Sequence, residues 1–221
     1  MADFETIQME TGNNPDAAVI WLHGLGANGN DFVPIVKQLH LPDNFSIRFI
    51  FPHAPVRPIT INQGLEMPGW YDISSLSIVD EEDEAGIIAS SAAIHDLCKT
   101  LEEEGIAADR IILAGFSQGG AIALHSGLNY PKALGGIMAL SAYLPKCSNI
   151  ETCNDRKTSV FMAHGLQDNV VAPVFGKQSR QRLEEAGCEI TWHEYPMAHS
   201  VCIEEIQAIS RWLQKRLGVA A

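Results

Sequence analysis

The sequence predicts an α/β fold in which helices cover both faces of a mostly parallel central sheet. Short apolar runs alternate along the chain with amphipathic stretches, the order in which crossover helices join parallel strands. The runs are apolar at nearly every position, as strands are when both of their faces are buried. The chain has 221 residues and no evident linker or repeat, so we expect a single domain over 1–221.

Six runs bounded by Gly, Pro, Asn or His are predicted to form the sheet. Five are short and apolar, at residues 17–22, 47–51, 111–114, 136–140 and 160–163. The sixth, 188–195, alternates more between apolar and polar residues and is expected at an outer position. A further edge strand is expected at 4–9.

Helical signals fill the intervals between these runs. Asp31 is expected to cap a first helix that has Pro34 in its opening turn. Acidic residues at 81–84 favour a helix N-terminus, an apolar stripe follows them, and Gly105 is expected to end that helix. Further helices are predicted over 118–128, 173–187 and 201–217.

The stretch 52–79 interrupts the alternation. It contains four prolines and two glycines and is predicted to be a long irregular excursion. As a set, its apolar side chains exceed what a solvated loop carries, so we expect them to flank an acyl groove. Leu65, Met67 and Trp70 are the candidate lining residues. For any one of them, ordinary packing onto the domain is the alternative.

Composition and charge limit the classes of partner. The formal net charge is −12, which repels phosphate backbones, so no nucleic-acid partner is expected. The N-terminal segment lacks the features of a signal peptide, and no apolar run is long enough to span a bilayer. Five cysteines without a C-x-x-C pair indicate reduced thiols in a cytoplasmic protein. No cluster has the spacing of a metal site, so we expect neither a metal nor another cofactor.

The strongest local signal is Gly115-Phe116-Ser117-Gln118-Gly119, between an apolar run and a helix of small residues. This strand–turn–helix context is typical of a nucleophile elbow, where a tight turn raises a strained serine above the sheet. The dipole of the following helix favours negative charge at that point. The alternative is a glycine-rich turn that holds an unreactive serine.

A serine nucleophile requires a base and a carboxylate that orients it. In proteins with this elbow both follow the serine along the chain, with the acid first. Asp168 directly follows the run 160–163, whereas Asp155 precedes that run and would lie at the opposite edge of the sheet. Asp168 is therefore the predicted acid.

His199 is the predicted base. It stands between the outer run 188–195 and the last helix, where a loop can reach the serine. His193 lies inside the strand pattern, and His164 precedes the acid. The predicted catalytic residues are thus Ser117, Asp168 and His199.

A glycine-rich loop, His23-Gly24-Leu25-Gly26-Ala27-Asn28-Gly29, follows the run 17–22. One of its backbone N–H groups, together with that of Gln118, could form an oxyanion hole. The loop also matches the dinucleotide fingerprint, which requires an acidic residue about 20 positions further on. The chain has apolar residues and a proline there, so a dinucleotide site is not expected.

With these motifs, the chain resembles the carboxylesterase and acyl-protein thioesterase (phospholipase/carboxylesterase) family of α/β-hydrolases. The resemblance extends over nearly the whole chain, because it includes the glycine-rich loop, Gly69-Trp70-Tyr71-Asp72, the elbow and the segments that carry Asp168 and His199. It implies an α/β-hydrolase fold without a large cap domain. It also implies the N–H groups of Leu25 and Gln118 as the oxyanion hole, and no metal or organic cofactor.

The resemblance further implies small acyl esters, lysophospholipids or acyl-protein thioesters as substrates. The predicted function is therefore a serine hydrolase that cleaves carboxylic esters or thioesters through an acyl-enzyme. A main role as acyl-protein thioesterase or lysophospholipase, and a non-catalytic binding protein of the hydrolase fold, are the alternatives. A homodimer is compatible with the family.

Overall fold

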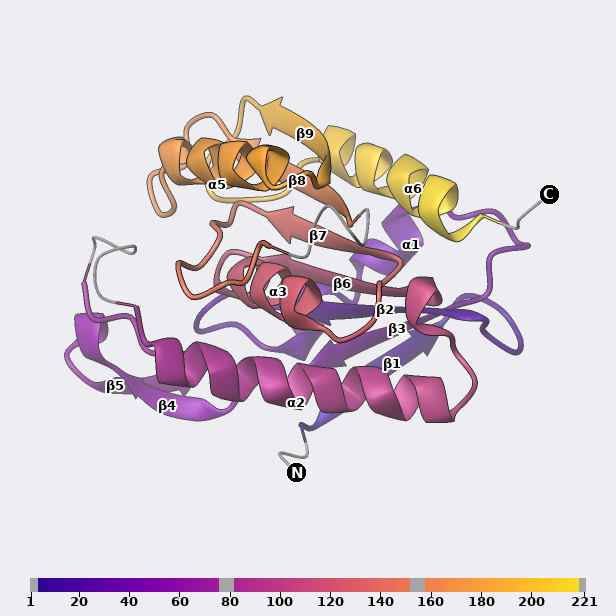
Figure 1. Cartoon of the computed structure of the whole chain (residues 1–221), viewed down its shortest axis with the longest axis horizontal. Helices are drawn as coiled ribbons and strands as arrows, with labels where there is room; N and C mark the ends of the chain where they lie inside the picture. Colours follow the sequence, from indigo (N-terminus) through magenta and orange to yellow (C-terminus); the bar gives the residue numbers. More distant parts are fainter. Residues whose placement is uncertain (1–3, 76–81, 152–157, 219–221) are drawn as a thin grey trace.

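The computed structural model describes residues 4–75, 82–151 and 158–218, and seven of its strands form the central sheet (Figure 1). Their order is β1-β3-β2-β6-β7-β8-β9, with β1 antiparallel to β3 and all other neighbours parallel. The predicted fold class is confirmed. The strands are β1 (Thr6–Glu10), β2 (Ala17–Leu22), β3 (Ile47–Pro52), β6 (Ile111–Phe116), β7 (Gly136–Leu140), β8 (Ser159–Gly165) and β9 (Glu189–Tyr195).

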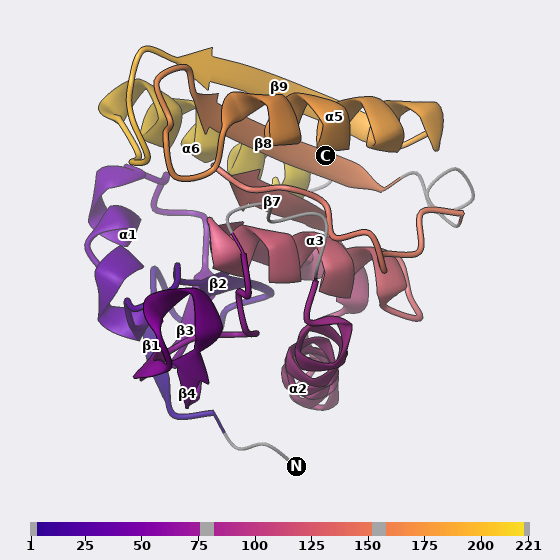
Figure 2. The ribbon, with the colours of Figure 1, turned by 90° about the vertical axis from the view of Figure 1, so that its left-hand side faces the viewer.

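Helices cover both faces of the sheet (Figure 2). α2 (Glu84–Glu103), α3 (Gln118–Asn129) and α5 (Pro173–Glu185) contribute to one apolar cluster, while α1 (Ile35–Gln38) and α6 (Ile203–Leu217) contribute to another. Successive residues of β2 alternate between the clusters, with Ile20 in the first and Val19 in the second. Both faces of the strand are therefore buried, which explains why its sequence is continuously apolar.

The helix starts differ from the prediction at one place. Asp31 caps no helix. Instead, the side chain of Asn28 accepts a hydrogen bond from the Asn30 N–H at the start of a 3₁₀ turn, and Pro34 precedes the short α1. Proline has no N–H to donate to the preceding turn, so the segment divides into two short helices. Gly105, with φ +98°, follows the end of α2 as predicted.

The prediction that 52–79 is irregular was wrong in part. The stretch contains an antiparallel hairpin of β4 (Val56–Ile59) and β5 (Leu65–Pro68), which lies beside the start of α2 (Figure 1). Its prolines, such as Pro58, disfavour a strand, so the sequence predicted none here. An isolated two-stranded ribbon tolerates them because its outer edges pair with no further strand.

The parallel strands present their carboxyl ends at one edge of the sheet. The loop of Leu25 follows β2, Ser117 follows β6, Asp168 follows β8, and His199 lies beyond the end of β9. In open α/β sheets, this edge is where ligands bind. Asp155, the rejected alternative acid, lies outside the described residues.

Cys98, Cys147 and Cys202 are free of disulfides, and Cys153 lies outside the described ranges. Burial raises the pKa of the Cys98 thiol to about 12 and that of Cys147 to about 11. These two side chains are therefore thiols at neutral pH. In the parts of the chain that the structure describes, no helix has the length and apolar character needed to cross a membrane.

Glu205 is the most unusual polar residue of the core. It is fully buried in the first turn of α6, and neither carboxylate oxygen has a hydrogen-bond partner among the described residues. Burial raises its pKa to about 8. The unfolded chain releases this proton at a lower pH than the folded chain does, so stability decreases as the pH rises through this interval.

We therefore expect Glu205→Gln to stabilise the protein increasingly with pH. Near pH 4 the buried Glu205 is protonated, so it and glutamine are both neutral in the folded protein. At pH 9 the variant should gain on the order of a few kcal/mol in free energy of unfolding, because each pKa unit corresponds to about 1.4 kcal/mol. Thermal unfolding across this range measures the gain. The exposed neighbour Glu204 provides the matched control, Glu204→Gln. A gain that is constant with pH would contradict the assignment.

Candidate active site

Ser117 occupies the turn between β6 and α3 with φ +54° and ψ −120°, a conformation that is strained for any residue other than glycine. Its N–H donates to the carbonyl of Leu140 at 2.8 Å, which holds the turn against the end of β7. A Cβ added to Gly115 would lie 2.2 Å from the Gly119 carbonyl oxygen, and one added to Gly119 would lie 2.4 Å from that of Leu22. The two glycines are thus required because backbones approach closely there.

Asp168 and His199 form a hydrogen-bonded pair. The distance from His199 Nδ1 to Asp168 Oδ2 is 2.7 Å. The other carboxylate oxygen, Oδ1, accepts from the N–H groups of Val170 and Val171, at 2.9 Å each. Asp168 is buried and has one oxygen left for the imidazole, so it fixes the His199 tautomer with the proton on Nδ1 and the lone pair on Nε2.

The serine, the histidine and the glycine-rich loop converge around Phe116. The His199 ring lies 4.6 Å from the Phe116 ring, between centroids, and Phe116 directly precedes Ser117. A Cβ added to Gly24 would lie 3.4 Å from Phe116 Cδ1 and 3.5 Å from Ser117 Cβ. Three loops that are far apart in the sequence therefore meet at one point.

Ser117 borders an apolar pocket of about 80 Å³. Its other lining residues are Leu25, Tyr71, Ile73, Gln118, Tyr143, Val170 and Val171. Gln118 is the first residue of α3, so its N–H has no acceptor within the helix. The structure thus brings Ser117, Leu25 and Gln118 together at one cavity. The sequence analysis missed Tyr143, which follows a core strand and has the pattern of a core residue.

The predicted groove residues lie elsewhere. Trp70 is completely buried, with its ring tilted by 42° against the His23 ring, so it cannot line a groove. Leu65 is 63% exposed on the outer part of the hairpin, and Met67 contacts the loop near Gly26. The indole N–H of Trp70 donates to the His23 carbonyl at 2.8 Å, so the buried ring leaves no donor unpaired.

The side chain of Gln118 joins the excursion to the elbow. Its Oε1 accepts from the Trp70 N–H and its Nε2 donates to the Tyr71 carbonyl, each at 2.8 Å. The amide is buried, and it satisfies two backbone groups that have no strand ladder. In the sequence, this role of Gln118 is indicated by a polar amide at the start of a helix whose other residues are small and apolar.

The imidazole of His23 supports the loop of Leu25. Its Nε2 accepts from the Ala54 N–H at 3.0 Å, so the proton is on Nδ1, which donates to the Gly24 carbonyl at 2.7 Å. Burial lowers the pKa of His23, in keeping with this neutral tautomer. On the other side, the Gly26 N–H donates to the Pro68 carbonyl at 2.8 Å, which ties the loop to the hairpin.

The two rival histidines differ from His199 in their surroundings. His164 is buried under the acid loop, with Nε2 2.8 Å from the Val171 carbonyl oxygen and 3.6 Å from Asp168 Oδ2, and burial lowers its pKa. It supports the loop from below. His193 lies on β9 between the rings of Phe161 and Tyr195. Across the described ranges, no group of three His, Cys, Asp or Glu side chains could hold a metal ion.

This combination defines the class of protein. A mostly parallel sheet with a strained serine on a strand-to-helix turn, and a histidine–aspartate pair on later loops at the same edge, is the arrangement of an α/β-hydrolase. The chain belongs to the phospholipase/carboxylesterase family, because the Phospholipase/Carboxylesterase family model matches residues 4–217. It is accordingly an esterase or thioesterase.

Relatives with similar sequences carry a common description. The acyl-protein thioesterase 1 of Neurospora crassa is 43% identical over 217 residues, which cover 93% of this chain and 89% of that protein. The acyl-protein thioesterase 1 of Mycosarcoma maydis is 36% identical over 228 residues, with 95% of each chain covered.

Solved structures give the same fold. Acyl-protein thioesterase 2 of Zea mays has a TM-score of 0.85 at 27% identity, over 98% of this chain and all of that one. Arabidopsis thaliana SOBER1 has a TM-score of 0.84 at 31% identity, over 91% and 99% of the two chains. A Bacillus cereus carboxylesterase, at 21% identity and a TM-score of 0.78 over 97% and 95%, shares the fold.

The environment of His23 leads to a prediction. His23→Ala removes the acceptor of the buried Ala54 N–H, so we expect the free energy of unfolding to decrease by about 1–3 kcal/mol. Thermal unfolding measures this loss. His23→Gln, whose Oε1 can replace Nε2 as acceptor, is the matched control and should lose less. A His23→Ala variant as stable as the wild type would show that the hydrogen bond has no such role.

Proposed function

We propose that the protein hydrolyses carboxylic esters and thioesters through a catalytic triad of Ser117, His199 and Asp168. The observation that carries this proposal is the 2.7 Å bond between His199 and Asp168, on a loop packed against the elbow of the strained Ser117. Asp168 holds the imidazole with its Nε2 lone pair available as a base. This is the arrangement that nucleophilic catalysis by a serine requires.

In the first half-reaction, Ser117 Oγ attacks the acyl carbonyl carbon while His199 Nε2 takes the hydroxyl proton. Asp168 stabilises the imidazolium that forms. The negative charge that develops on the carbonyl oxygen is held by the backbone N–H groups of Leu25 and Gln118, two residues that border the same cavity as the serine. Collapse of the tetrahedral intermediate breaks the bond to the alcohol or thiol, which leaves with the proton from His199.

In the second half-reaction, water attacks the acyl-enzyme carbonyl and gives a proton to His199. The same two N–H groups stabilise the second oxyanion. When Ser117 leaves, it regains its proton, and the free carboxylic acid is released. His199 thus serves as base and then as acid in each half-reaction. Each proton that it takes up is returned, to the leaving group in the first half and to Ser117 in the second.

We assign the acyl group of the substrate to the pocket beside Ser117. Its lining is apolar, with Ile73, Val170 and Val171 beside Ser117. The relatives named acyl-protein thioesterase support acylated proteins as one source of such thioesters. A lysophospholipid would present the same acyl carbonyl to Ser117. The two substrates differ in the leaving group, which is a thiol in an acyl-protein thioester and an alcohol in a lysophospholipid.

Replacing the nucleophile gives the first test. Ser117→Ala should lower kcat for p-nitrophenyl butyrate by a factor on the order of 10³–10⁶, because the acyl-enzyme can no longer form. The matched control is Ser141→Ala, since Ser141 also follows a parallel strand, has φ +46° and is buried. It should keep its activity. A Ser117→Ala variant that retains a tenth of the activity would refute the triad, and failure of a fluorophosphonate probe to label the wild type would favour a non-catalytic binding protein.

Replacing the acid and base gives the second test. We expect losses in kcat on the order of 10³–10⁴ for Asp168→Asn and His199→Ala, because the imidazole loses its tautomer in one and is absent in the other. His193→Ala is the control for removal of a half-buried imidazole and should remain close to wild type. Should His193→Ala prove as damaging as His199→Ala, our assignment of the base would be untenable.

A further inference from the structure

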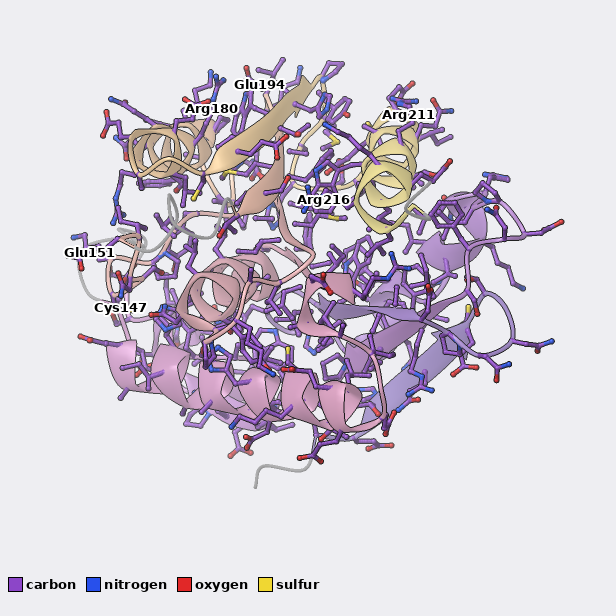
Figure 3. All side chains as sticks on the ribbon, turned by 45° about the vertical axis from the view of Figure 1, so that its right-hand side comes forward. Cys147, Glu151, Arg180, Glu194, Arg211 and Arg216 are labelled. Atoms are coloured by element: carbon purple, nitrogen blue, oxygen red, sulfur yellow. The ribbon has the colours of Figure 1, made fainter. Side chains whose placement is uncertain are left out.

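Two cavities lie on either side of Tyr143. The first is the pocket of about 80 Å³ at Ser117. The second, of about 330 Å³, has Leu144 and Phe175 among its walls and lies against α5. Tyr143 lines both, at the start of the loop that carries Cys147 and Glu151 out between α2 and α5 (Figure 3).

The wall at Tyr143 is held from both ends. Its hydroxyl is 2.7 Å from the hydroxyl of Tyr71, and both side chains are almost completely buried. The Tyr71 backbone is fixed in turn by Gln118 Nε2, at 2.8 Å. The next residue along the chain, Leu144, donates its N–H to Ser179 Oγ of α5 at 2.7 Å. The hydroxyl partner of the Tyr143 ring is thus fixed to the start of α3, and the neighbouring backbone is fixed to α5, so the ring does not swing aside at low cost.

We propose that Tyr143, held by Tyr71, ends the acyl pocket and limits the enzyme to short acyl groups. This inference rests on the proposed function, because it takes the acyl group to lie in the pocket beside Ser117. The pocket is small beside the roughly 300–1,000 Å³ of sites that enclose most of a drug-sized ligand. The second cavity falls within that range, and Tyr143 lines both it and the pocket at the serine.

Chain-length preference is the property that this wall controls. Each methylene that moves from water into an apolar pocket contributes about fourfold to binding. Methylenes that find no room contribute nothing, or they displace the acyl carbonyl from Ser117. Removal of the ring would join the pocket to the second cavity, whose walls include Leu144 and Phe175, so that longer chains could be buried.

The experiment compares kcat/KM for p-nitrophenyl butyrate and p-nitrophenyl octanoate. The wild type should prefer butyrate. Tyr143→Ala should raise the octanoate-to-butyrate ratio at least tenfold, since two of the four added methylenes suffice for that at about fourfold each. The ratio is measured within one preparation, so a reduced folded fraction cancels. Tyr143→Leu is a second variant that also removes the ring, for use if the alanine variant does not fold.

Two controls separate the wall from other effects. Tyr143→Phe keeps the ring and removes only the hydroxyl, so it should retain the wild-type ratio. Tyr130→Ala removes another buried tyrosine, whose hydroxyl bonds to Glu102 away from the pocket, and should also retain it. An unchanged ratio in both Tyr143→Ala and Tyr143→Leu, or a wild type that prefers octanoate, would overturn the proposal.

The triad is tested separately in the same background. Ser117→Ala added to Tyr143→Ala should abolish hydrolysis of both esters. If octanoate hydrolysis persists in that double variant, the proposed function fails, whatever the chain-length ratio shows. If hydrolysis is lost but the ratio in Tyr143→Ala alone is unchanged, the triad stands and the wall at Tyr143 is refuted.

Discussion

The close approach of α3 to the end of β2 is the constraint on which the site depends. Gly119 lies so near the carbonyls of Leu22 and His23 that even a methyl group would not fit. This contact fixes how far the helix start can lie from the loop of Leu25. Leu25 and Gln118 therefore border one cavity because two backbones touch. The same geometry requires the strained backbone conformation of Ser117, which is stabilised by the packing of the surrounding sheet.

Side chains take over the hydrogen bonding where the backbone leaves regular structure. The backbone of Trp70 and Tyr71 has no ladder partner, so the Gln118 side-chain amide accepts from the Trp70 N–H and donates to the Tyr71 carbonyl in its place. His23 does the same for Ala54 and Gly24. Buried backbone groups must be paired, so the excursion can pack against the elbow only because these polar side chains are buried with it.

The elements that could be predicted from the sequence are those with a strong local pattern. β2 and β7 were predicted residue for residue, because both faces are buried and every residue is apolar. The elbow was predictable because its glycines are required by packing. The β4–β5 hairpin was missed because Pro58 and Pro68 usually interrupt strands, and Asp31 was expected to cap a helix that Asn28 and Pro34 divide. Tyr143 could not be recognised, since only the tertiary structure places it between two cavities.

The order of the elements along the chain has a consequence for biosynthesis. A nascent polypeptide that has completed β6 and α3 already contains the serine and its turn, but His199 lies just before the last helix, α6. The ribosome must release nearly the whole chain before His199, the proposed base, can reach the elbow. Under the proposed mechanism, partly synthesised or C-terminally truncated molecules lack the base, and hydrolysis begins only when the last parallel strand has joined the sheet.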